Sequence, residues 1–269
     1  MRLSIRHETT YRYDTPATYA IQTLRLTPRS HEGQYVAAWR IDIDRDCRLD
    51  KREDAFGNLT HTFSIDGAIR ELSIVALGQI ETQDCHGVVR GVAERFPPAL
   101  FLRETELTAH DRAIADFAEE VARASGSDTL AALHRLMAGV HERMRFDCDA
   151  TETTTTAAEA FAAGHGVCQD LTHVFISAAR RLGIPARYVG GYMFRGDGEN
   201  EQEAGHAWAE AHVEGLGWVG FDPANCICPT DAHVRVAMSL DCLGATPVRG
   251  VRYGGSDEQL AVAVSLTAL

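Results

Sequence analysis

The chain has 269 residues, of which 45% are hydrophobic and 24% are charged. These are ordinary globular values, so they exclude wholesale disorder and allow one large domain or two modest ones. The net charge is -12 and Lys51 is the single lysine. Because an acidic chain repels phosphate groups, nucleic acid and anionic membrane surfaces are poor candidates as partners.

The cysteines and the first residues bear on the compartment. The chain has seven cysteines, an odd number scattered over its length, which argues against a disulfide framework. Residues 1–16 are polar and alternating, and no stretch resembles a secretory signal or a membrane span. We therefore expect a cytoplasmic protein that keeps its thiols reduced.

Residues 1–85 have the alternating pattern of β-strands. Gly57-Asn58 lies between two such runs, 48–56 and 59–65, and predicts a hairpin. Further strands are expected over 21–26, 36–43 and 70–80. Pro97-Pro98 then breaks the pattern. The prediction is a β-rich N-terminal domain over residues 1–95 and a second domain over 96–269.

Apolar residues recur at helical spacing after these prolines, and strand-like alternation returns later. This mixture predicts that the second domain is α+β. Gly215 and Gly217 mark a turn between its last two strands. The expected elements in chain order are a helix capped near Thr108 and Asp111, helices over 128–145, 157–163 and 168–182, and strands over 187–193, 206–213 and 218–221.

Cys168 stands at the start of one of these helices, after the glycines of Gly164-His165-Gly166-Val167. The first N–H groups of a helix have no partner and carry partial positive charge, which stabilises a thiolate. The same groups can bind an oxyanion. A lone cysteine is more often a small buried hydrophobic residue, but the flanking glycines and the partners described next favour a nucleophile.

A nucleophilic cysteine needs a base and a group that orients the base. His206 begins a predicted strand beside a loop, and Asp222 ends the following strand. The midpoint between them falls beside the turn at Gly215, so the two residues can be cross-strand neighbours. A carboxylate there can hold the imidazole and favour its protonated form. The weaker candidates for the base are His165, His173 and His212.

Three segments, 166–170, 205–208 and 220–223, resemble the core of the transglutaminase-like superfamily. The chain is most similar to bacterial members, in which a β-rich domain precedes the core. The resemblance covers about 110–230 by specific motifs and 1–85 by pattern. It implies a papain-like fold, in which the helix that carries the nucleophile packs on an antiparallel sheet. It also gives Cys168, His206 and Asp222 the three catalytic roles.

The resemblance leaves the reaction open, because the family includes transglutaminases, proteases, deamidating enzymes, peptide N-glycanases and inactive members. The sequence shows no acidic calcium-loop pattern, which favours amide hydrolysis over calcium-dependent crosslinking. Cys226 and Cys228 form only a CxC pair, without the second pair that a zinc site of the N-glycanase kind would need. We therefore expect neither a metal nor a cofactor.

In the expected reaction the Cys168 thiolate attacks a carboxamide or peptide carbonyl, His206 protonates the leaving amine, and Asp222 holds the ring. Gln169 is a candidate side-chain donor to the oxyanion, and Trp208 a candidate wall of the cleft or a plain core residue. The expected partner is a peptide or protein substrate. Two alternatives stay open: acyl transfer like that of the arylamine N-acetyltransferases, and a non-catalytic interaction module on the same scaffold.

Overall fold

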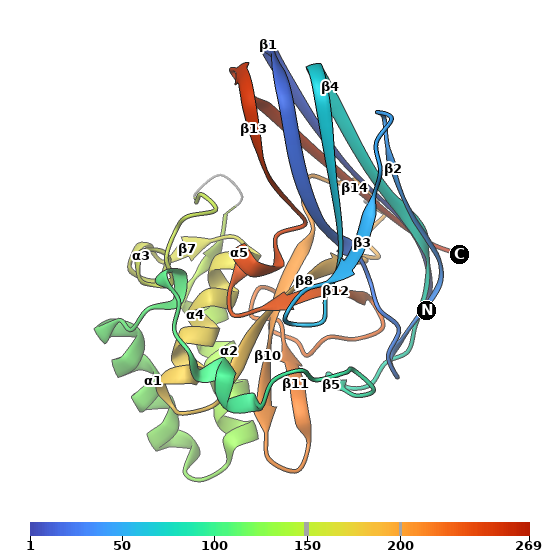
Figure 1. The fold of residues 1–269 in the computed structure, drawn as a ribbon. Helices are drawn as coiled ribbons and strands as arrows, with labels where there is room; N and C mark the ends of the chain where they lie inside the picture. The colour runs from blue at the N-terminus through green and yellow to red at the C-terminus, as the bar shows by residue number, and fades with distance from the viewer. Residues whose placement is uncertain (148–150, 199–200) are drawn as a thin grey trace.

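The computed structural model of the protein describes residues 1–147, 151–198 and 201–269. Cys148, one of the seven cysteines, lies outside these ranges. The described strands form a seven-stranded sheet, a five-stranded sheet and a short parallel pair. Figure 1 shows the larger sheet projecting above a lower body, in which helices cover one side of the smaller sheet.

The seven-stranded sheet is built on two long strands that pair along most of their length. The runs predicted over 21–26, 59–65 and 70–80 are parts of these strands, because irregularities in the register shift the pairing without ending it. The strands are β1 (Arg2–Thr27), β2 (Gln34–Ile43), β3 (Asp50–Glu53), β4 (Leu59–Thr82), β9 (Glu201–Gln202), β13 (Val248–Ser256) and β14 (Gln259–Ala268).

The predicted hairpin at Gly57-Asn58 is confirmed. It joins β3 to β4, which pair antiparallel. Gly57 has a φ of 85°, a conformation that glycine adopts without strain. The Asp54 carboxylate closes the turn by accepting the backbone N–H groups of Phe56 and Asn58, each at 3.0 Å.

The lower body contains the predicted helices. Its helical segments are η1 (Pro98–Leu102), η2 (Glu106–Thr108), α1 (Arg112–Ser125), α2 (Thr129–Arg143), α3 (Ala157–Ala163), α4 (Cys168–Arg181) and α5 (Cys242–Ala245). The cap predicted at Thr108 is wrong: the Asp111 side chain accepts the N–H of Ile114 at 3.0 Å. Thr108 is engaged elsewhere, because its hydroxyl accepts a hydrogen bond from Arg180. No described helix is long and apolar enough to span a membrane.

The five-stranded sheet has the order β12-β8-β10-β11-β5, and all its pairs are antiparallel. Its strands are β5 (Val88–Val89), β8 (Ala186–Met193), β10 (His206–Val213), β11 (Gly217–Phe221) and β12 (His233–Ser239). Helix α4 packs against β8 and β10, and α1, α2 and α3 pack against α4. Nearly every residue of α4 is therefore buried. The expected fold class, a helix packed on an antiparallel sheet after a β-rich region, is confirmed.

The last two strands lie in the first sheet. β14 pairs with β1 from Leu3 opposite Ala268 to Arg12 opposite Gln259, and β13 pairs with the other half of β1. The two termini consequently lie on the same side of the molecule (Figure 1). The division into two domains between residues 95 and 96 stays a prediction. In the structure, strands from both ends of the chain share one sheet.

Candidate active site

Cys168 is half-buried at the first position of α4. Gly164, with a φ of 72°, ends α3. The chain then forms the short strand β7 (His165–Gly166), parallel to β6 (Arg145–Phe146), before Val167 leads into α4. The buried Asp170 carboxylate accepts the Val167 N–H at 2.9 Å and so fixes this turn. Cys168 is thereby held where the unpaired N–H groups of the helix begin.

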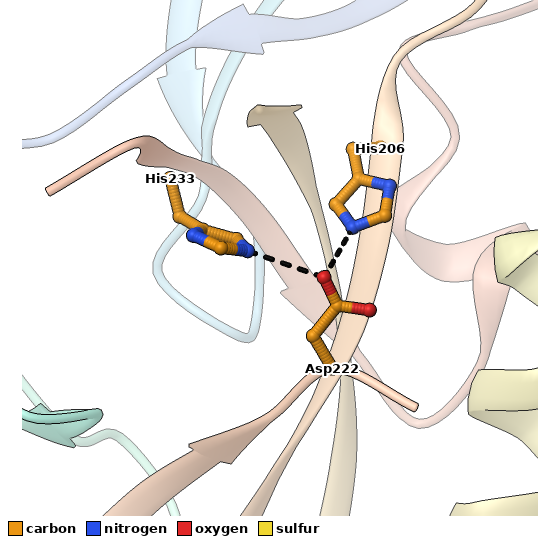
Figure 2. A group of neighbouring side chains, drawn as sticks. All are labelled: His206, Asp222 and His233. Carbon is orange, nitrogen blue, oxygen red and sulfur yellow. Dashed lines mark hydrogen bonds and ion pairs between the residues drawn. The ribbon is translucent and has the colours of Figure 1, made fainter. Parts of the chain in front are cut away.

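His206 and Asp222 come together across the β10–β11 hairpin. The register pairs Ala209 with Phe221, so Asp222, the next residue, falls opposite Trp208. His206 is two residues further along β10 on the same face, which makes it a diagonal neighbour of Asp222. Figure 2 shows the two side chains pointing toward one another, with His206 Nε2 2.7 Å from Asp222 Oδ2.

The Asp222 carboxylate is fully buried and held by several donors. Its Oδ1 atom accepts the backbone N–H groups of Ala224 and Asn225, at 3.1 and 3.2 Å. Its Oδ2 atom contacts Asn225 Nδ2 at 2.7 Å and His233 Nε2 at 3.2 Å, in addition to His206. Burial raises the pKa of the carboxyl, but the hydrogen bonds from His206 and His233 outweigh it and hold the pKa well below its usual range.

His206 contacts both of the other predicted catalytic residues. Because its Nε2 atom faces Asp222, its Nδ1 atom is left for the Cys168 thiol, which also acts on the charge of the ring. Burial lowers the pKa of the imidazole, but the hydrogen bonds to Asp222 and Cys168 prevail and raise it to about 10. The site therefore favours a protonated His206 at neutral pH, which is the partner a thiolate needs.

The two candidate cleft residues, Trp208 and Gln169, have different surroundings. Trp208 is 2% exposed and its ring lies 6.2 Å from that of His206, so it supports the site from the core side. The Gln169 amide donates to the Thr153 carbonyl at 3.4 Å, which turns it toward the loop before α3. A role for Gln169 as an oxyanion donor stays a prediction.

The three weaker candidates for the base have other surroundings. His173 is fully buried and its Nε2 atom accepts the backbone N–H of Cys242 at 3.1 Å. Burial lowers the pKa of His173 to about 4, so it is neutral at physiological pH. His212 packs edge-on against Trp218 at the far end of β10, and His165 lies in β7. Of the described histidines, the two that contact Asp222 are His206 and His233.

Asn225 and His233, which were not predicted from the sequence, both bond to Asp222. Asn225 had a local signal: an aspartate before Pro223 commonly accepts the N–H groups of the following turn. His233 had none, because it belongs to β12, and its place depends on the pairing of β12 with β8.

The side chains at this site also resemble a metal-binding cluster. One potential ligand atom from each of His206, Asp222 and His233 lies within 4.8 Å of the other two. Direct contacts of 2.7 and 3.2 Å already join these atoms. The geometry is that of hydrogen bonds converging on a carboxylate. Cys226 and Cys228 do not belong to this group, and none of the six described cysteines forms a disulfide.

Comparisons with known proteins identify the family. Residues 3–81 match the bacterial transglutaminase-like N-terminal region, and residues 115–223 match the transglutaminase-like superfamily. The chain belongs to the transglutaminase-like superfamily. The resemblance seen in the sequence is thus confirmed, and it places the protein in a family of cysteine enzymes.

Relatives of this transglutaminase-like chain match it along nearly its whole length. An uncharacterized protein of Mycobacterium leprae is 26% identical and aligns over 100% of this chain and 99% of its own. One of Mycobacterium tuberculosis is 25% identical over 96% and 90%. A crystal structure from Cytophaga hutchinsonii, of a protein named as a proposed cysteine protease, has a TM-score of 0.75 at 16% identity and covers 99% of this chain and 98% of that one. It shows that the two chains share their fold.

Proposed function

We propose that the protein is a cysteine hydrolase that cleaves peptide or carboxamide bonds through Cys168, His206 and Asp222. One observation carries the proposal: a buried carboxylate lies 2.7 Å from Nε2 of an imidazole whose charge is also stabilised by the Cys168 thiol. That thiol stands at the N-terminus of a helix. A nucleophile, a base and a group that orients the base are thus aligned in the order that acyl transfer to sulfur requires.

In the first half of the reaction, the Cys168 thiolate attacks the carbonyl carbon and the carbonyl oxygen becomes an oxyanion. Unpaired N–H groups at the start of α4 stabilise this charge. His206 gives its Nδ1 proton to the departing amine as the carbon–nitrogen bond breaks, leaving a thioester on Cys168. Asp222 holds the ring in place throughout, and its charge stabilises the imidazolium.

In the second half, water attacks the thioester and His206 takes up the proton of the water, which releases a carboxylic acid and restores the thiolate. An amine attacking at the same point would give transfer. Hydrolysis is the simpler reaction for this arrangement, because it needs no binding site for an acceptor amine. We propose a peptide or protein substrate, neutral or basic, because the chain carries a net charge of -12.

The proposal is tested by mass spectrometry of a peptide library incubated with the protein, with and without a primary amine. We expect cleaved or deamidated peptides whose formation is abolished by Cys168→Ala. Incorporation of the amine would identify a transferase instead, and turnover of acetyl-CoA would identify the arylamine N-acetyltransferase-like alternative. If iodoacetamide modifies Cys168 no faster at pH 6 than an ordinary thiol, the proposal is wrong and the interaction module is favoured.

A further inference from the structure

A second histidine, His233, lies against the Asp222 carboxylate. Its ring is buried and packs edge-on against Trp208, with centroids 5.4 Å apart. Its Nδ1 atom accepts the backbone N–H of Thr230 at 3.2 Å. The proton of a neutral ring must then be on Nε2, so His233 donates to Asp222 Oδ2 at 3.2 Å. Figure 2 shows both imidazoles reaching this oxygen.

The two imidazoles have different surroundings. The side chain of His206 is 12% exposed and that of His233 is 2% exposed. His206 exchanges a proton with the substrate in the proposed reaction. The contacts of His233 are instead with Thr230, Trp208 and Asp222. His233 therefore supplies a fixed donor that keeps the Oδ2 atom directed at His206.

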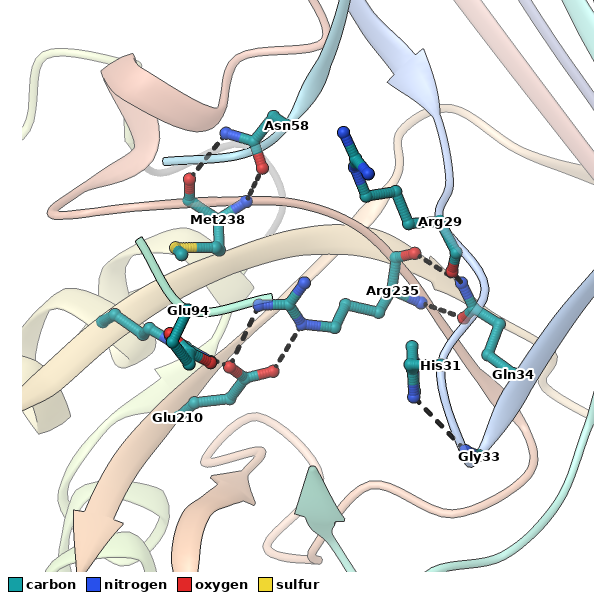
Figure 3. Close-up of polar contacts among 10 residues, drawn as sticks. Arg29, His31, Gly33, Gln34, Asn58, Glu94, Glu210, Arg235 and Met238 are labelled. Carbon is teal, nitrogen blue, oxygen red and sulfur yellow. Dashed lines mark hydrogen bonds and ion pairs between the residues drawn. The ribbon is translucent and has the colours of Figure 1, made fainter. Parts of the chain in front are cut away.

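His233 is itself held by the N-terminal region. It begins β12, which is at the edge of the five-stranded sheet and pairs with β8 alone. The outer edge of β12 is occupied by the side chain of Gln34, from the start of β2. Gln34 Oε1 accepts the Arg235 N–H at 2.8 Å, and its Nε2 atom donates to the Arg235 carbonyl at 2.9 Å. Figure 3 shows this amide seated between the Arg29 and Arg235 backbones.

A second amide makes the same contact further along β12. Asn58 Nδ2 donates to the Met238 carbonyl and Asn58 Oδ1 accepts the Met238 N–H, both at 2.8 Å (Figure 3). At the other end of the strand, the Thr82 hydroxyl donates to the carbonyl of Asp231, next to the Thr230 that fixes the ring of His233. Side chains of the first sheet and of its β3–β4 turn thus satisfy backbone groups that an edge strand leaves free.

We propose that His233 is a positioning residue of the reaction and that the N-terminal region acts on the site through it. Gln34 fixes β12, β12 places His233, and His233 holds the Asp222 carboxylate in line with His206. The inference rests on the proposed function, because it assumes that Asp222 orients a catalytic base. It gives the N-terminal region a role in catalysis that requires no contact with the substrate.

The first test compares His233→Leu with His233→Gln, whose amide N–H can replace the lost donor. The readouts are kcat and KM on a cleaved peptide and the rate at which iodoacetamide modifies Cys168, followed on the Cys168 peptide by mass spectrometry. Because a hydrogen bond to a charged group is removed, we expect His233→Leu to lower kcat about tenfold to hundredfold at unchanged KM. His233→Gln should recover most of this loss.

The matched control is His212→Leu. His212 packs edge-on against Trp218 at 5.3 Å, much as His233 packs against Trp208, but it does not contact Asp222. We expect its substitution to change thermal stability and leave the modification rate of Cys168 unchanged. If His233→Leu and His233→Gln lower kcat equally, or in proportion to their loss of thermal stability, His233 has a merely structural role and the inference is wrong.

The second test separates the two amides. Gln34→Met and Asn58→Leu each remove the contacts of one amide with β12, but Gln34 bonds two residues from His233 and Asn58 bonds five residues away. We expect Gln34→Met to slow modification of Cys168 several-fold more than Asn58→Leu does, when the two are compared at equal loss of thermal stability. Equal effects would contradict transmission from Gln34 through His233.

His206→Ala provides the reference that separates the two proposals. If it leaves the modification rate of Cys168 unchanged, the proposed catalytic site fails. If it slows modification while His233→Leu behaves as the unsubstituted protein, the site stands and the positioning role of His233 is disproved.

Discussion

The charge of His206 depends on the carboxylate beside it. Asp222 is buried, yet the donors around it keep it ionised, and its charge in turn keeps the imidazole protonated. The two effects have opposite dependence on pH. Stability from Asp222 is present above its unfolded pKa of 3.8 and is lost as the pH falls through its depressed folded pKa. Stability from His206 is complete below 6.5 and is lost as the pH rises through about 10.

Asp222→Asn tests this dependence. The amide keeps the shape of the side chain but removes the charge, so we expect the pKa of His206 to fall from about 10 toward its ordinary value. NMR titration of the His206 imidazole measures the shift, and kcat should fall by roughly 10² to 10⁴, the range that proton transfer contributes. An unchanged titration midpoint would show that Asp222 does not control the charge of the base.

Among the elements, helix α4 sets the position of the nucleophile, and Gly166 sets the position of α4. A Cβ atom at Gly166 would lie 2.7 Å from two atoms of Asp170, whose carboxylate caps the helix. The cap and the nucleophile are two residues apart, so a displaced cap moves Cys168. The closeness of the backbone to Asp170 is therefore the physical reason for a glycine at this position.

Gly166→Ala is expected to lower the free energy of unfolding by about 1–3 kcal/mol, as overpacked sites do, and to slow modification of Cys168. Urea denaturation measures the first effect and iodoacetamide the second. Gly190→Ala is the control, because a Cβ there would meet its neighbours at ordinary distances of 3.7 Å or more. If iodoacetamide modifies Cys168 at the same rate in both variants, the cap at Asp170 does not govern the nucleophile.

At the scale of the whole molecule, a largely buried network of charges joins the segment between β5 and η1 to the five-stranded sheet. Arg187 lies between Glu94 and Glu210, with nitrogen–oxygen distances of 2.7 Å to each, and its guanidinium covers the Trp218 ring at 3.8 Å. Glu210 also contacts Arg235, whose backbone Gln34 holds. Burial raises the pKa of Glu210, but the two arginines prevail and lower it to about 2.

Glu210→Gln should therefore destabilise the protein strongly, by about 3–5 kcal/mol, because it leaves buried arginine charge uncompensated. Because Arg235 is also bonded to Gln34, we expect both sheets to unfold in one transition, measured by denaturant titration with fluorescence and circular dichroism. Asp42→Asn, which breaks the exposed pair with Arg40, is the control and should change stability little. Two separate transitions would show that the network does not couple the sheets.

Local sequence was enough to predict most of the helices and strands up to residue 221 and the closeness of His206 to Asp222, because turns, caps and hairpins are short-range features. Gly215 placed Asp222 near His206 for that reason. The position of His233 could not be predicted, since β12 pairs with β8 across an intervening stretch of chain that contains β10 and β11. The pairing of β13 and β14 with β1 was not predicted either, because these strands lie at opposite ends of the chain. Thr108 resembled a helix cap, but the Arg180 side chain, which bonds its hydroxyl, comes from a distant element.

The pairing of β1 with β14 has a consequence for biosynthesis. β1 is synthesised before the residues of the site, but its partner β14 is made after every one of them. The sheet that carries Gln34 is therefore incomplete until synthesis has passed residue 268. Contacts of such long sequence separation also form slowly. A nascent chain thus exposes Cys168 before the groups that control it are in place, and an assembled site appears only late in synthesis.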